Sequence, residues 1–388
     1  MKNQKTFNQS TNTIRQRTAV FFSERKKGVY LNLMVNTINM FGLGFASFYF
    51  QTQGLAFYKI MLVWAIGPLV TLPFLYFINR WHTKTLLKLG VLSYAGAALS
   101  LLFYNEYSYL LFSVFNGLML SLFWISFNTV FFNRLAVNQH AKDSSLYFIL
   151  PALSGMIMPP LGALVIDNFG YKVLFLIAFM ACIVPLLYIQ GKYFDYKENI
   201  TFRQANKALS GIRLIAFIDS AIHFFQWHFL TIYALLFLKT EYELGGLLGY
   251  LALISLFVSF ALSYASDRYK KRTAILLPLL LIMSMLIIAM PTLNSLTLLI
   301  PIIGLYAILD NLSMPIRFAV RLDMGTGDTG FWRASEFYGN IGRTTIFALS
   351  AAFLYIGNYW LPFFMFAIIT AIFPLIIKYK LRKRNQKC

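Results

Sequence analysis

Twelve long apolar runs, with the charged residues confined almost entirely to the gaps between them, constrain the fold of this 388-residue chain more than any other feature. A helix of roughly 20 apolar residues crosses the hydrocarbon layer of a bilayer, and each run is about that long. The runs therefore predict twelve membrane-spanning helices, at residues 29–50, 55–78, 86–104, 108–131, 145–166, 172–191, 212–238, 244–265, 273–290, 296–316, 334–356 and 359–378.

The basic residues fall almost entirely in every second gap. When the runs are numbered from a cytoplasmic N-terminus, only Lys59, Lys172 and Lys239 lie on the outer side. Arg343 lies inside a run, so 30 of the 34 Lys and Arg residues lie on the inner side. This is the positive-inside asymmetry that orients membrane proteins during insertion. It predicts a multi-pass protein of the cell membrane with both ends in the cytoplasm.

The composition agrees with a bilayer environment and excludes other classes of protein. Charged residues make up 12% of the chain, about half of their share in an ordinary soluble domain. The net charge of +20 is divided among short loops, whereas a nucleic-acid surface gathers its basic residues on one face. We therefore expect the lipid bilayer, and no nucleic acid, as a partner. Two cysteines predict no structural disulfide, and the polar first 27 residues predict no cleaved signal peptide.

The two halves of the chain resemble each other at a constant offset of 188 residues, since Asn79-Arg80 matches Asp267-Arg268. Transporters built from such repeats place the substrate between the repeats and rock one half against the other. The longest inner gap separates the halves. The predicted domains are a basic N-terminal segment at 1–28, six-helix bundles at 29–191 and 212–378, a cytoplasmic linker at 192–211 and a basic tail at 379–388.

Two motifs carry a resemblance to a known family. The inner loop SYASDRYKKRTAILLP places a small residue, Ser263, four positions before an acidic–basic pair, and further basic residues follow. The fifth run contains SGMIMPPLGAL, a glycine–proline helix-packing motif with Ser154, Pro159, Gly162 and Ala163 in matching places. With the span count and the repeat, these motifs resemble the major facilitator superfamily. The resemblance implies an all-α integral membrane fold of twelve helices in two pseudo-symmetric six-helix bundles.

The signature loop of that family implies a cytoplasmic gate between the halves. The expected gate residues are Asn79, Arg80, Asp267, Arg268, Arg272 and Arg321. In the first-half copy of the loop Asn79 replaces the acid, so Asp267 is the only acid of the two loops and Arg321 is its expected partner. The pair can latch the halves in one state, or Asp267 can simply cap the turn, and both interpretations stay open.

Ionisable residues inside the runs are concentrated in the second half. They are Asp219, Asp310, Glu336 and Arg343. A charge at mid-membrane is costly, so each one needs a partner or a function. Asp219, His223 and either Gln226 or Trp227 follow helical spacing on the seventh run. An acid and an imidazole one turn apart can relay protons or contact substrate, or they can stabilise packing as a hydrogen-bonded pair.

Three other helices carry polar stripes. These are Glu336, Asn340 and Arg343 on the eleventh run, Asn32, Asn36 and Asn39 on the first, and Ser121, Trp124 and Asn128 on the fourth. Such stripes suit either a substrate cavity or hydrogen bonds between helices. Arg343 is expected to pair with Glu336 or with Asp310, because a partner offsets the cost of its burial.

Together these features predict a secondary transporter that moves a small organic solute by alternating access, coupled to protons through the acids of the second half. Export is favoured because the glycine–proline motif is commonest in exporters of the family that the chain resembles. Three acids against one arginine inside the runs argue against a strongly anionic solute. Proton-symport uptake, a lipid flippase or scramblase, and a membrane-embedded enzyme remain alternatives. The sequence contains no catalytic constellation, metal-ligand motif or cofactor motif.

Overall fold

A computed structural model describes residues 27–132, 140–192, 195, 197, 200–265, 272–324 and 329–385. Nearly all of these residues are helical, and the β pairing within them is limited to one isolated bridge between His82 and Lys197. Backbone groups in hydrocarbon must find hydrogen-bond partners within the chain, and a helix satisfies them locally. The all-α prediction is confirmed.

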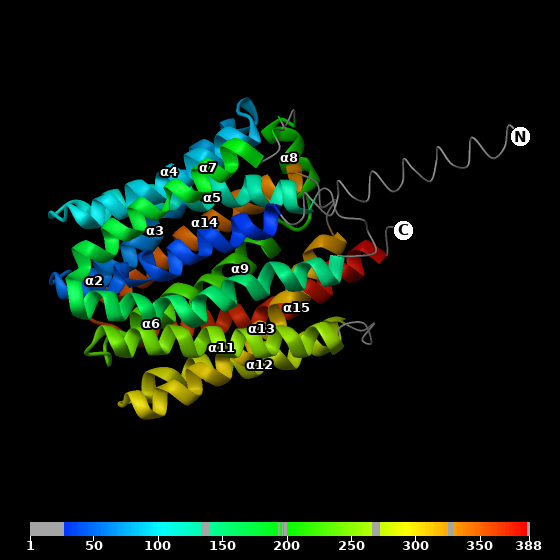
Figure 1. Cartoon of the computed structure of the whole chain (residues 1–388). Helices are drawn as coiled ribbons and strands as arrows, with labels where there is room; N and C mark the ends of the chain where they lie inside the picture. The colour runs from blue at the N-terminus through cyan, green and yellow to red at the C-terminus, as the bar shows by residue number, and fades with distance from the viewer. Residues whose placement is uncertain are drawn as a thin grey trace, which may run out of the picture.

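The N-terminal half holds the first six predicted spans (Figure 1). Its first span is the helical segment Lys27–Thr52, which includes the 3₁₀ turn η1 (Leu43–Phe45) and helix α2 (Ala46–Thr52). The elements that follow are α3 (Phe57–Phe77), the 3₁₀ turn η2 (Ile78–Arg80), α4 (Thr83–Leu102), α5 (Ser108–Phe132), α6 (His140–Ala181) and α7 (Ile183–Lys192).

Two predicted spans are joined in α6 and α7. The apolar stretch Ile149–Gly191 has 43 residues, about twice the length that crosses a bilayer. Gly170, with φ 79° and ψ 168°, breaks the helical geometry inside it. A residue without a Cβ adopts this positive φ without strain, and the chain reverses its direction there. The fifth and sixth spans are therefore separate passes, as expected.

The C-terminal half holds the remaining six spans. The linker contributes the short helix α8 (Phe202–Ala208), which a capping box between Thr201 and Gln204 begins. The elements that follow are α9 (Arg213–Phe224), the π-helix η4 (Phe225–Phe229), α10 (Leu230–Ala234), α11 (Glu241–Ala265), α12 (Arg272–Ala289), the 3₁₀ turn η6 (Met290–Thr292), α13 (Leu296–Met324), α14 (Thr329–Tyr355) and α15 (Trp360–Asn385).

Nine helices of the described residues are long and apolar enough to span a membrane singly, and the bent pair α8 with α9–α10 makes a tenth candidate. The double pass in α6–α7 adds one more span. The last is α14, whose polar residues keep it outside an apolarity criterion although its 27 residues are long enough to span. The structure thus accommodates all twelve predicted spans.

The internal repeat is visible in the helix boundaries. Shifting α3, α4 and α5 by 188 residues gives 245–265, 271–290 and 296–320, which coincide closely with α11, α12 and α13. The halves meet chiefly where α6 packs along α11 and α3 packs along α14. We call the end of the bundle that holds η2, α8 and the C-terminal end of α15 the linker end (Figure 1).

Candidate functional site

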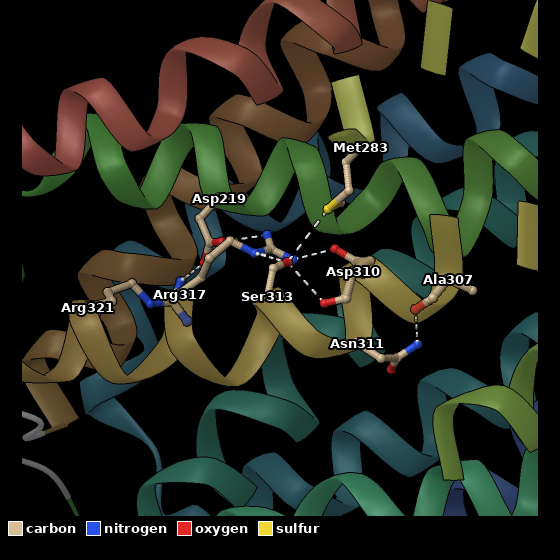
Figure 2. A network of polar contacts seen from close by, with 8 residues as sticks. All are labelled: Asp219, Met283, Ala307, Asp310, Asn311, Ser313, Arg317 and Arg321. Atoms are coloured by element: carbon tan, nitrogen blue, oxygen red, sulfur yellow. Dashed lines mark hydrogen bonds and ion pairs between the residues drawn. The ribbon is translucent and has the colours of Figure 1, made fainter. Parts of the chain in front are cut away.

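Arg317 of α13 lies at the centre of a buried polar cluster in the C-terminal half (Figure 2). Its Nη1 atom is 2.8 Å from Oδ1 of Asp219 on α9, and its Nη2 atom is 2.5 Å from Oδ1 of Asp310, two turns earlier on α13. Its Nε donates to Ser313 Oγ at 3.2 Å. The Arg317 side chain is only 1% exposed. The two carboxylates explain how so buried a guanidinium is tolerated.

The two carboxylates of this cluster differ in how fully they are neutralised. Asp219 contacts a second arginine, because its Oδ2 atom lies 3.4 Å from Nη1 of Arg321. Among the described residues Asp310 pairs with Arg317 alone, and its buried Oδ2 atom has no hydrogen-bond partner there. Asp310 therefore holds the spare acceptor of the cluster. No group of three or more His, Cys, Asp or Glu side chains in the described part of the chain is placed to hold a metal ion.

Arg317 overturns the charge balance expected from the sequence. The predicted tenth span ended at residue 316, but α13 continues to Met324, so Arg317 lies inside the bundle beside two of the three acids. The argument from three acids against one arginine was therefore wrong. Apolarity ends at the first group of charges, whereas an arginine with partners can stay inside. The i, i+7 spacing of Asp310 and Arg317 was the sequence signal for this pair.

The polar stripe expected on the seventh span is divided in the structure. Asp219 contacts Arg317 and Arg321, and no hydrogen bond joins it to His223 within the described residues. The His223 ring lies 6.0 Å from the ring of Trp227, centroid to centroid. Trp227 is 40% exposed and belongs to the π-helix η4, whose wider turn changes the direction of the side chains that follow α9.

The same π-helix brings α9 into contact with the N-terminal half. The ring of His228 stacks on Trp64 of α3 with 3.7 Å between the ring centroids. Gln226 is buried, and its Oε1 atom has no partner among the described residues. Because π-turns interrupt regular helices mostly at functional positions, this segment is a plausible place for a helix to adjust.

A second polar cluster crosses between the halves. Asn340 of α14 donates from Nδ2 to Thr71 Oγ1 on α3 at 2.7 Å and to Ser121 Oγ on α5 at 3.2 Å. Arg343 donates from Nη1 to Asn340 Oδ1 at 2.6 Å and pairs with Glu336 Oε2 at 2.8 Å. Of the two partners expected for Arg343, Glu336 is therefore the one that it contacts.

The remaining polar residues of the first and fourth spans are less connected. Asn36 Nδ2 donates to the carbonyl and to the side-chain oxygen of Asn32, at 2.8 and 2.5 Å, so these two amides bond within one helix. Asn39 and Trp124 are partly buried. Asn128 Oδ1 is buried without a hydrogen-bond partner among the described residues. This amide and Gln226 leave acceptors that a bound solute could use.

The glycine–proline motif lies where α6 meets the first span and α11. Its residues are Ser154, Pro159, Gly162 and Ala163. A Cβ on Gly162 would lie 2.4 Å from the carbonyl oxygen of Phe41, so only glycine permits this approach of the two backbones. On the other side, a Cβ on Gly245 of α11 would lie 2.9 Å from Pro159 O and 3.1 Å from Ala163 Cβ. The motif therefore packs at the interface between the halves.

The expected gate residues lie largely outside the described part of the chain. Asp267 and Arg268 fall outside it, as do the side chains of Asn79 and Arg272. Arg80 is exposed, and its guanidinium lies 4.8 Å from the ring centroid of Phe77. Arg321 contacts Asp219, and its pair with Asp267 stays a prediction.

An arginine that the sequence placed in a loop joins the halves at the linker end. Arg333 of α14 is fully buried. It donates from Nε to Leu75 O at 2.6 Å, from Nη2 to Tyr76 O at 2.5 Å and from Nη1 to Ile200 O at 2.9 Å. The predicted eleventh span began at residue 334, whereas α14 begins at Thr329. No sequence signal identifies this contact, because its acceptors are backbone carbonyl groups.

No curated protein matches this chain. The model of the Major Facilitator Superfamily matches residues 28–324, which cover the first ten predicted spans and most of the chain. Helices α14 and α15 lie beyond the matched residues and complete the two halves. The chain is therefore a member of the major facilitator superfamily, a family of transporters with twelve membrane-spanning helices.

Proposed function

We propose that this transporter exports a small organic solute from the cell in exchange for protons, by alternating access. Its linker end faces the cytoplasm, since the basic residues of the sequence favour that side. Export is supported by the glycine–proline motif at the contact of α6 with α11, because that motif is commonest in exporters of the superfamily. The two predicted six-helix domains, 29–191 and 212–378, are the bodies that rock against each other.

The observation that carries the proton coupling is Arg317 held between Asp219 and Asp310. Asp219 contacts two arginines, while Asp310 shares one of them and keeps an unpartnered Oδ2 atom within the described residues. A proton on that Oδ2 would neutralise Asp310 and leave Arg317 to Asp219. Proton occupancy would then determine whether Arg317 holds α13 alone or α13 together with α9.

The solute is placed between this cluster and the one that crosses the halves. Helix α9 contacts both, because the guanidinium of Arg343 lies 4.6 Å from the ring centroid of Phe224 on α9. The proposed solute contacts are His223, Gln226, Trp227, Glu336, Trp124 and Asn128. A change at Asp219 would reach these residues through α9, which is how proton binding would alter the affinity for the solute.

Transport in proteoliposomes tests the coupling. A thermal-shift screen of a solute library first supplies a ligand, and an entrapped pH dye then records the protons that move with it. We expect solute-driven proton flux in the wild type, and its loss in Asp310→Asn with solute exchange retained. Glu106→Gln, which removes an exposed loop acid, is the matched control and should behave as the wild type.

Direction is tested in everted membrane vesicles. An acid interior should drive solute into these vesicles if the protein exports by antiport, and out of them if it takes up solute by symport. Transport that moves no protons in the wild type, or undiminished gradient-driven accumulation by Asp310→Asn, would show that this cluster does not couple protons to transport.

A further inference from the structure

The linker between the halves is tied to the N-terminal half at its start. Lys84, at the beginning of α4, donates from Nζ to Gln190 O at 2.7 Å and from its backbone N to Asp195 Oδ1 at 3.4 Å. His82 Nδ1 lies 3.1 Å from Asp195 Oδ2. These contacts hold the first part of the linker against the turn between α3 and α4, at the linker end of the bundle.

The second part of the linker is tied to the C-terminal half. Tyr338 of α14 donates from its hydroxyl to Asn206 Oδ1 on α8 at 2.9 Å. The ring of Phe202, the first residue of α8, lies 4.8 Å from the ring of Phe337 on α14 and 5.1 Å from that of Tyr76 on α3. The linker therefore lies across the place where α3 and α14 meet.

Arg333 is the residue in which these contacts converge. Its three hydrogen bonds reach the last turn of α3, at Leu75 and Tyr76, and the linker, at Ile200. The guanidinium also lies 5.6 Å from the ring centroid of Phe202. The last four carbonyl groups of a helix lack partners within it, and a cation is stabilised by their negative end. A residue of the C-terminal half thus caps a helix of the N-terminal half.

We propose that Arg333 is the gating residue of the linker end, and that it closes this end by fastening α3 and the linker to α14. When the halves rock apart at this end, α3 and α14 separate, and the bonds to Leu75 and Tyr76 break. The bonds therefore stabilise only those states in which the linker end is closed. The first-half signature loop has Asn79 where the second-half copy has an acid, and Arg333 supplies a latch to the same corner from the opposite half.

This gate needs alternating access but neither protons nor a particular solute, so it can be tested without either. Spin labels at Thr85 on α4 and Tyr379 on α15, both exposed near the linker end, report the separation of the halves by pulsed electron–electron distance measurement. The protein is the full chain in lipid nanodiscs, with Cys182 and Cys388 replaced. Arg333→Gln removes the charge and the forked donors while keeping a polar side chain of moderate size.

We expect Arg333→Gln to lower the ratio of closed to open molecules at the linker end by about tenfold or more, since hydrogen bonds to charged groups are the strong ones. Arg333→Lys should restore part of the ratio, because an ammonium carries the charge but cannot fork to three carbonyl groups. Arg213→Gln is the matched control. Arg213 also donates to a linker carbonyl, that of Asn206, and lies over Tyr338, but no described contact joins it to the N-terminal half.

A distance distribution unchanged in Arg333→Gln would overturn the proposal, and so would an equal shift in Arg213→Gln, which would point to a general effect of the linker. If Arg333→Gln does not fold, Phe202→Ala decides the question, because it leaves the three hydrogen bonds and removes the rings packed around them. We expect a shift of about threefold in the same direction from Phe202→Ala. No shift in that variant would refute the gate. Loss of proton coupling in a transport assay would leave these outcomes untouched.

Discussion

Replacing Arg317 with methionine tests whether the buried cluster is held together by charge. The substitution removes two ion pairs at 2.8 and 2.5 Å from a side chain that is 1% exposed. Asp219 keeps Arg321 at 3.4 Å, but Asp310 is left without a described partner. Removing one member of a buried pair costs about 3–5 kcal/mol of folding free energy, mostly because a charge stays buried and uncompensated.

A second substitution separates that cost from the loss of packing. In Arg317→Met/Asp310→Asn the uncompensated carboxylate becomes a neutral amide, so we expect the loss to fall to about 1–2 kcal/mol. The free energy of unfolding can be measured from tryptophan fluorescence during titration of detergent micelles with dodecyl sulfate. Arg80→Met, at an exposed arginine, is the control and should change this free energy by less than about 0.5 kcal/mol.

Two outcomes would refute this reasoning. A loss below about 1 kcal/mol in Arg317→Met would mean that the interior of the cluster is hydrated well enough to tolerate a lone carboxylate. Additive losses in the double variant would mean that Arg317 and Asp310 contribute independently, since interacting residues are expected to show a coupling energy.

Three further predictions concern topology and packing. Cysteine at Glu106 should react in intact cells with a reagent that does not cross membranes, and cysteine at Lys207 should not; the reverse pattern would invert the orientation. Gly162→Ala should lower the free energy of unfolding by about 1–3 kcal/mol, because its Cβ would lie 2.4 Å from a carbonyl oxygen, whereas Gly191→Ala, in open space, should be neutral or slightly stabilising. Asn340→Ala should cost about 1–3 kcal/mol in the same dodecyl sulfate titration, since it breaks the bonds from α14 to α3 and α5; an unchanged value would mean that water replaces the amide there.

Most of the fold could be predicted from the sequence, because partition between water and lipid is a local property of each run. A stretch of apolar residues enters the bilayer whichever helix it later meets, and the basic gaps orient it. The repeat offset likewise predicted where α11, α12 and α13 would lie. The polar residues Asp219, Asp310, Glu336, Asn340 and Arg343 were identified for the same reason, since a charge or amide inside an apolar run is conspicuous.

The partners of these residues depended on the tertiary structure. Arg317 and Arg333 stand near the ends of apolar runs, where the sequence is equally compatible with an arginine in solvent and one inside the bundle. Their burial is decided by Asp219, 98 residues away on α9, and by carbonyl groups at the end of α3. The π-helix η4 is also invisible to periodicity, which assumes one helical pitch. Hydropathy records the cost of placing each residue in lipid, whereas pairing depends on which helices pack together, and that is settled only when the two halves assemble.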